Sequence, residues 1–184
     1  MNLRIALAPT MLLLFWLGGC SHGLIEPNTA APTSTDAFFI MGVSNEDTRV
    51  GISAGTVDER SFTATNDVSI LSKNLAFEGV VHNGYIVGKV PADTPLGLVF
   101  LQTDDNALYS PCMLTDLSNT LVFNAKAGKV IHIADIEMVR YYQKLKPNYR
   151  SDIQRARAFL SSHYPNLAGS LEPGTYRMLH SNKC

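Results

Sequence analysis

Short apolar runs separated by turn-forming residues recur from residue 37 to the end of the chain. Several of them alternate apolar and polar positions, which is the period of a β-strand with one buried face. Asn83-Gly84 stands between two such runs, and both residues tolerate the positive φ of a tight hairpin turn. The sequence therefore predicts a mainly β domain with strands near residues 38–43, 50–57, 61–71, 74–81, 85–90, 96–103, 120–124, 130–138 and 175–179.

One segment has the period of an amphipathic helix instead. Ser151 and Gln154 have the spacing of a capping box, and Pro165 follows the last apolar position. The segment therefore predicts a helix near residues 151–164. Its apolar stripe would consist of Ile153, Ala156, Phe159, Leu160 and Tyr164. Together, the strands and this helix predict an immunoglobulin- or transthyretin-like β-sandwich over residues 37–184.

The strand near residues 130–138 has the clearest alternation. We expect Asp135 and Glu137 to face one side of the sheet. The other side would carry Val130, His132, Ala134, Ile136 and Met138.

The first 19 residues have the pattern of a signal peptide. Arg4 is followed by an apolar run over residues 5–16, which is too short to span a bilayer as a helix. The next residues, Leu17-Gly18-Gly19-Cys20, resemble the lipobox of bacterial lipoproteins, in which the cysteine accepts a diacylglyceryl group. The alternatives are an ordinary cleaved signal peptide, or an uncleaved anchor with a cysteine there by chance.

The resemblance to bacterial lipoproteins has two further implications. Ser21 after the lipidated cysteine favours the outer membrane, where Asp would favour retention at the inner membrane. The anchored protein would face the periplasm. Residues 20–36 then predict a flexible tether, since this stretch has Pro27, Pro32 and many small polar residues.

A second resemblance concerns the domain. The stretch from Phe123 to Ile136 looks like a strand motif of uncharacterised bacterial lipoproteins with a small β-sandwich domain, and Tyr164-Pro165 looks like the end of their C-terminal helix. His132 and Ala134 depart from that motif, which has an aromatic residue and a glycine there. This likeness implies a fold and an address, and it implies no activity.

Charge is unevenly distributed although the net charge of the chain is −1. Residues 21–125 contain 4 basic and 12 acidic residues, whereas residues 126–184 contain 10 basic and 4 acidic ones. The basic residues between 140 and 157 predict a patch for an anionic lipid, a cell-wall polymer or an acidic envelope protein. The alternative is an ordinary solvated surface. The patch would consist of Arg140, Lys144, Lys146, Arg150, Arg155 and Arg157. Nucleic acid is not expected as a partner of an exported protein.

Candidate chemistry is weak elsewhere. Gly51-Ile52-Ser53-Ala54-Gly55 matches the G-x-S-x-G pattern of serine hydrolases, but its flanks predict a glycine-rich strand and not a strand–turn–helix elbow. None of His82, His132, His163 and His180 has a second ligand at metal spacing, so no metal or cofactor is expected. Residues 104–106, Asp-Asp-Asn, favour a turn over a calcium loop.

Two function classes remain. The first is a membrane-anchored, non-catalytic binding or assembly module of the cell envelope, and the alternative is an envelope hydrolase that uses Ser53. The absence of a convincing nucleophile, acid–base pair or cofactor motif in the sequence favours the first.

With Cys20 assigned to lipid, Cys112 and Cys184 are left as one possible disulfide in an oxidising compartment. We expect this bond to fasten the end of the chain. The alternatives are two free thiols, or pairing of Cys184 with another molecule.

Overall fold

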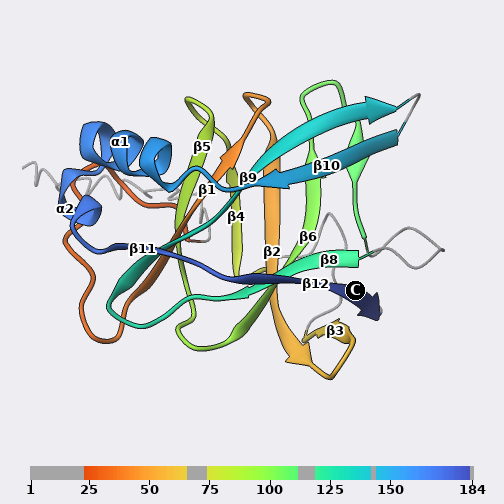
Figure 1. Cartoon of the computed structure of the whole chain (residues 1–184), viewed down its shortest axis with the longest axis horizontal. Coiled ribbons are helices and arrows are strands. Elements are labelled where there is room, and N and C mark those ends of the chain that lie inside the picture. The colour runs from red at the N-terminus through yellow and green to blue at the C-terminus, as the bar shows by residue number, and fades with distance from the viewer. Residues whose placement is uncertain (1–22, 66–73, 112–118, 142–143, 183–184) are drawn as a thin grey trace, which may run out of the picture.

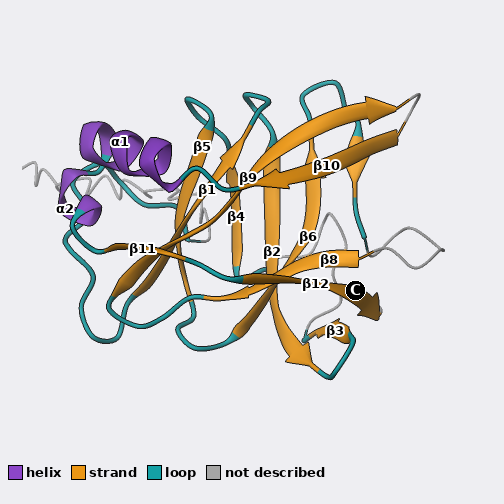
Figure 2. Cartoon of the chain, viewed as in Figure 1, coloured by secondary structure: helices purple, strands orange, loops and turns teal. Residues whose placement is uncertain are grey.

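Two β-sheets and two short helices make up the part of the chain that the computed structural model describes, which is residues 23–65, 74–111, 119–141 and 144–182 (Figures 1 and 2). The prediction of a mainly β protein is confirmed. The helices are α1 (Ile153–His163) and α2 (Pro165–Ala168). The strands are β1 (Ala37–Val43), β2 (Arg49–Val57), β3 (Ser61–Ala64), β4 (Phe77–Val80), β5 (Tyr85–Val90), β6 (Pro95–Gln102), β7 (Leu108–Tyr109), β8 (Asn119–Asn124), β9 (Lys129–Tyr141), β10 (Lys144–Arg150), β11 (Leu171–Pro173) and β12 (Tyr176–Asn182).

The first sheet has the strand order β10-β9-β1-β5, with β11 also paired to β9. Strand β1 is parallel to β9 and antiparallel to β5. Every residue of β1 is buried, because one face of this sheet packs on the second sheet and the other is covered by the helices. Phe39 and Met41 point into the core between the sheets, whereas Phe38 and Ile40 pack beneath α1.

The second sheet closes on itself. Its strands run β2-β3-β12-β8-β6, and β6 pairs again with β2, so that these strands form a small barrel; β4 and β7 are attached at its margins. Phe62 fills the barrel, and its ring lies against Gly55 and Gly97, where a Cβ atom would overlap it. The barrel and the parallel pairs β1–β9 and β3–β12 were not expected, and an immunoglobulin- or transthyretin-like sandwich is not confirmed.

A β-bulge interrupts β9. Ile40 of β1 pairs with His132, but Gly42 pairs with Asp135, so β9 has one more residue than β1 over this interval. Val130 therefore faces the helices, while Ile136 faces the core between the sheets. The predicted alternation is wrong on this point, because an extra residue reverses the faces of all later side chains.

The turn at Asn83-Gly84 has the expected conformation, with φ values of 54° and 77°. The strands beside it do not pair with each other as a hairpin, however. Strand β4 pairs with β2 of the second sheet and β5 pairs with β1 of the first, and only His82 and Tyr85 bridge at the turn. The turn thus carries the chain from one sheet to the other.

The expected helix is present, but its ends differ from the prediction. Asp152 is the N-cap of α1, in place of Ser151, and its carboxylate accepts the N–H of Arg155 at 3.0 Å. The helix ends at His163, and Pro165 begins the separate turn of α2, since proline lacks an N–H but suits the first position of a helix. Ala156 and Leu160 form the buried part of the stripe.

Residues 23–36, expected to be part of a flexible tether, lie against the domain. The carbonyl of Gly23 accepts the N–H of Lys89 at 2.8 Å, and Leu24 bridges Gly88 at the edge of β5. Asp36 forms an ion pair with Lys89. The apolar side chain of Ile25 packs beside the α1 core, which the count of small polar residues did not anticipate. Neither described helix is long and apolar enough to cross a membrane.

Candidate functional site

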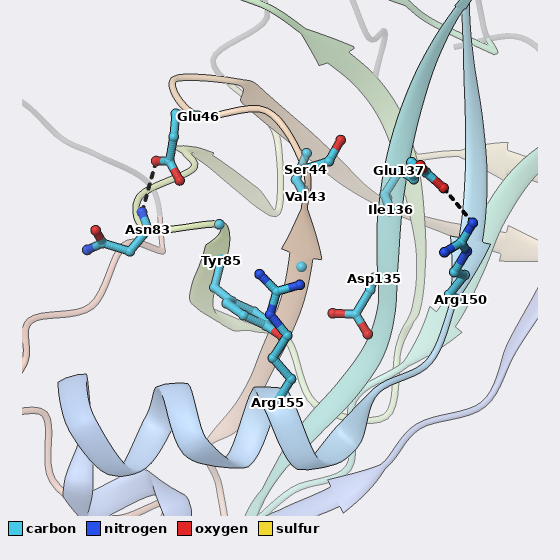
Figure 3. Close-up of a pocket in the computed structure, with 12 residues that line it drawn as sticks. Val43, Ser44, Glu46, Asn83, Tyr85, Asp135, Ile136, Glu137, Arg150 and Arg155 are labelled. Atoms are coloured by element: carbon cyan, nitrogen blue, oxygen red, sulfur yellow. Dashed lines mark hydrogen bonds and ion pairs between the residues drawn. The ribbon is translucent and has the colours of Figure 1, made fainter.

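A polar pocket of about 370 Å³ opens where the β1–β2 loop, the Asn83-Gly84 turn, β9 and the beginning of α1 meet (Figure 3). Its charged walls are formed by Glu46, Asp135, Glu137, Arg150 and Arg155, and Tyr85 lies between them. The elements that supply these residues belong to different parts of the chain, so the pocket exists only in the folded protein.

The bulge in β9 positions Asp135. Residues three apart on a regular strand lie on opposite faces, but the extra residue places Asp135 on the same face as His132, with 3.2 Å between a carboxylate oxygen and Nε2. The same oxygen, Oδ2, accepts the N–H of Asp152 at 2.7 Å. The carboxylate lies directly over Gly42, where any Cβ would overlap it. Glycine at position 42 therefore makes room for this acid.

Burial and hydrogen bonding shift the pKa of Asp135 in opposite directions. Burial raises the pKa of this carboxyl group, but contact with His132 and the hydrogen bond from the Asp152 N–H outweigh it and leave the pKa below its usual range. The imidazole of His132 is almost completely buried, at 1% exposure, so its contact with Asp135 is screened from solvent. The pair holds an ionised carboxylate at the inner wall of the pocket.

Tyr85 supplies a hydroxyl group that is buried beside Asp135. The side chain is 4% exposed, and its hydroxyl makes no well-aligned hydrogen bond with any described residue. Burial, followed by the charge of Asp135, raises the pKa of this phenol, so the hydroxyl stays protonated and available as a donor. The guanidinium of Arg155 lies over the Tyr85 ring, 5.9 Å from its centroid.

The other charged groups differ in their pairing. Arg150 donates to Glu137 at 2.8 Å, and Glu46 accepts the N–H of Asn83 at 2.9 Å. For Arg155, no carboxylate of the described residues comes within ion-pair distance. Arg155 is thus an exposed cation at the mouth of a pocket that already contains carboxylates.

The structure places the described residues of the predicted basic patch on both faces of the β9–β10 pair and on α1, and Arg150 and Arg155 line the same pocket. Arg140 is paired across the strands with Leu145, on the core-side face, and forms an ion pair with Asp105. Lys146 and Arg150 lie on the opposite face of β10, and Arg155 and Arg157 are exposed on α1. The side chain of Lys144 lies outside the described residues. The acids that pair with Arg140 and Arg150 come from distant sequence positions, which a local count of charges misses.

Ser53 lies in the middle of β2, as the interpretation of G-x-S-x-G as a glycine-rich strand predicts. It is fully buried, and its hydroxyl donates to the carbonyl of Ala54 at 3.0 Å. The sharp strand-to-helix turn that exposes a hydrolase nucleophile does not occur at this position.

The remaining candidates behave as local structure. Asp105 accepts a hydrogen bond from Thr103, and Asn106 has a φ of 62°, so this acidic run makes the turn between β6 and β7. His163 stacks on Phe159 at the end of α1. Within the described ranges, no three His, Cys, Asp or Glu side chains are grouped as metal ligands would be.

Cys20, Cys112 and Cys184 all lie outside the described residues. Described residues that lie three to seven positions from the last two in sequence are, however, in contact with one another. Tyr109 donates from its hydroxyl to the carbonyl of Asn119 at 2.9 Å, and Asn119 pairs with His180 of β12. Tyr109, Asn119 and His180 therefore lie near one another at the edge formed by β8 and β12.

The Asp135 environment leads to a pH prediction. Because the folded pKa is depressed below the reference value of 3.8, its ionised form stabilises the fold above that value, and this stability is lost as the pH falls through the folded pKa. We expect Asp135→Asn to be less stable than wild type at about pH 6, with the difference narrowing as the pH falls below 3.8. Urea unfolding at each pH measures this. The exposed Glu59→Gln should track wild type, and a gap for Asp135→Asn that stays constant with pH would contradict the assignment.

Sequence reasoning placed Arg155 in the basic segment but did not identify Tyr85, Asp135 or Glu46 as neighbours of it. The available signal for Asp135 was an acid between the apolar residues Ala134 and Ile136 of β9. Comparison with family models, curated proteins and solved structures gives no match for this chain.

Proposed function

We propose that the protein is a lipid-anchored protein of the cell envelope whose folded part is a non-catalytic binding or assembly module. The observation that carries the proposal is Leu17-Gly18-Gly19-Cys20 directly after a short apolar run. Lipid chains on Cys20 would hold the protein at a membrane, because each buried methylene contributes about 0.8 kcal/mol and more than one chain anchors stably. Ser21 favours the outer membrane, with the domain facing the periplasm.

The packing of residues 23–36 supports a close attachment. Since Gly23 is hydrogen-bonded to β5, only Ser21 and His22 separate Cys20 from the folded domain. Three consecutive Cα–Cα steps span at most about 11 Å. The domain would therefore sit next to the bilayer surface, within reach of lipid head groups, cell-wall polymer or another envelope protein.

The finer fold class is part of the proposal. Side chains from both sheets share the main core, which supports a sandwich-type arrangement. The barrel closure distinguishes it from the antiparallel immunoglobulin type.

Lipidation is tested by metabolic labelling with an alkyne-tagged palmitate. We expect wild type to incorporate the label and to sediment with membranes. Cys20→Ser should lose both properties, because no thiol remains at position 20 to accept the diacylglyceryl group. Cys112→Ser is the matched control and should label as wild type does. Equal labelling of Cys20→Ser and wild type would refute the anchor.

A further inference from the structure

The pocket beside α1 contains a cation without an acid partner among the described residues, a buried hydroxyl without a well-aligned hydrogen bond, and two carboxylates that each have one oxygen accepting no described N–H. We propose that it binds a small zwitterion, namely an amino acid, with the ligand carboxylate on Arg155 and its ammonium group toward Asp135 and Glu46. This proposal deepens the binding role proposed above and rests on it, but it does not depend on the lipid anchor.

Arg155 is placed to bind the carboxylate. Its guanidinium has no acid partner among the described residues and is held over the Tyr85 ring, with one terminal nitrogen near Gly84. Figure 3 shows the side chain rising from α1 into the space between the Asn83 turn and Asp135. A guanidinium offers paired N–H donors that match the two oxygens of a carboxylate.

Tyr85 provides the second, independent sign of a ligand. Its hydroxyl is buried and protonated and belongs to a residue that lines the same pocket; Asp135 is nearby, but no well-aligned hydrogen bond joins the two. Buried hydroxyl groups in native proteins are nearly always hydrogen-bonded, so such a group in a pocket marks a position that a ligand atom or a water fills. A ligand carboxylate on Arg155 would lie beside this donor.

The acidic wall favours an ammonium group. Oδ2 of Asp135 contacts the N–H of Asp152 and the imidazole of His132, whereas Oδ1 lies above Gly42 and accepts no N–H of the described residues. Glu46 uses Oε2 for the N–H of Asn83 and keeps its other oxygen. The Arg150–Glu137 ion pair is neutral overall and supplies no net charge.

This charge arrangement selects among ligand classes. A simple anion would be attracted by Arg155 but repelled by Asp135 and Glu46. A simple cation would bind the two carboxylates but leave Arg155 without a partner. A molecule with one positive and one negative group can interact with Arg155 and with the two carboxylates at the same time. The volume of about 370 Å³ lies at the small end of ligand sites, which suits an amino acid better than an oligomer.

Calorimetric titration of the mature full-length protein in detergent tests the proposal. The probes are L-alanine, D-alanine, propionate, ethylamine and glucose. We expect one or both alanines to bind at least about tenfold more tightly than propionate or ethylamine, because each half-ligand loses one charge-assisted contact. Arg155→Gln should weaken alanine binding about tenfold, and Arg155→Lys should weaken it less. Arg157→Gln, an exposed change on the same helix, should bind like wild type.

Three results would overturn the proposal: propionate binding as tightly as alanine, glucose binding more tightly than alanine, or no heat from any probe up to about 10 mM, tenfold above a millimolar Kd. Glu46→Gln provides a second variant that lies in an exposed loop and should weaken alanine but not propionate. A failure here leaves palmitate labelling of Cys20 unaffected, so the two proposals fail separately.

Discussion

Phe77→Ala is expected to lower the free energy of unfolding by about 3 to 5 kcal/mol, which is the usual cost of removing a fully buried phenylalanine. Phe77 has no exposed surface and packs edge-on against Phe39, with ring centroids 4.8 Å apart. The backbone at Gly88 and Gly79 lies directly against its ring, so little can move to fill the cavity. Urea denaturation of the variant and of wild type measures the difference.

The neighbouring glycine provides a complementary test. A Cβ at position 88 would overlap the Phe77 ring, so Gly88→Ala should also destabilise the protein. Combined with Phe77→Leu, it should cost less than the sum of the two single changes, because the smaller side chain relieves the overlap. Val139→Ala is the exposed control and should change stability by no more than about 0.5 kcal/mol. A loss below about 1 kcal/mol for Phe77→Ala would contradict this packing.

Loss of the proposed Cys112–Cys184 disulfide is expected to lower the free energy of unfolding by an amount similar to that for Phe77→Ala. The bond would close a loop of about 70 residues, which corresponds to roughly 4 kcal/mol in the chain-entropy model, less any strain. The contact from Tyr109 to Asn119 and the pairing of Asn119 with His180 bring described residues near both cysteines in sequence close together, which supports the proposal. Cys112→Ser and Cys184→Ser should each lower the thermal midpoint.

Treatment with a reductant distinguishes loss of this disulfide from loss of side-chain packing as the cause of a lower thermal midpoint. Dithiothreitol should lower the midpoint of wild type to that of the single variants and should leave the variants unchanged. If both thiols of the oxidised protein react with an alkylating reagent before reduction, the disulfide does not form. In that case the end of β12 is held by non-covalent contacts, among them its pairing with β8 and β3.

The sequence predicted those features that depend on local chemistry. Asn83-Gly84 forms its turn because both residues adopt positive φ, and Ala156 and Leu160 are buried because helical spacing places them on one face. Ser53 was correctly placed in a strand because its flanks lack the turn that exposes a nucleophile.

The features that the sequence did not predict depend on contacts between distant segments. The extra residue in β9 cannot be recognised where most side chains on both faces of the strand are apolar. It nevertheless moves all later side chains to the opposite face of the sheet and so brings Asp135 beside His132. Closure of the barrel depends on β2 pairing with both β3 and β6. Arg140 and Arg150 appeared as free cations because their acids come from elsewhere in the chain, Asp105 from the β6–β7 turn and Glu137 from β9.

Intact-mass and N-terminal peptide analysis of the mature protein from its native membrane tests the anchored-module proposal most directly. We predict a chain that begins at Cys20 and carries a thioether-linked diacylglyceryl group on that residue, with loss of the preceding 19 residues. An unmodified chain that begins before or after Cys20, or one that retains the apolar run of residues 5–16, would contradict the proposal.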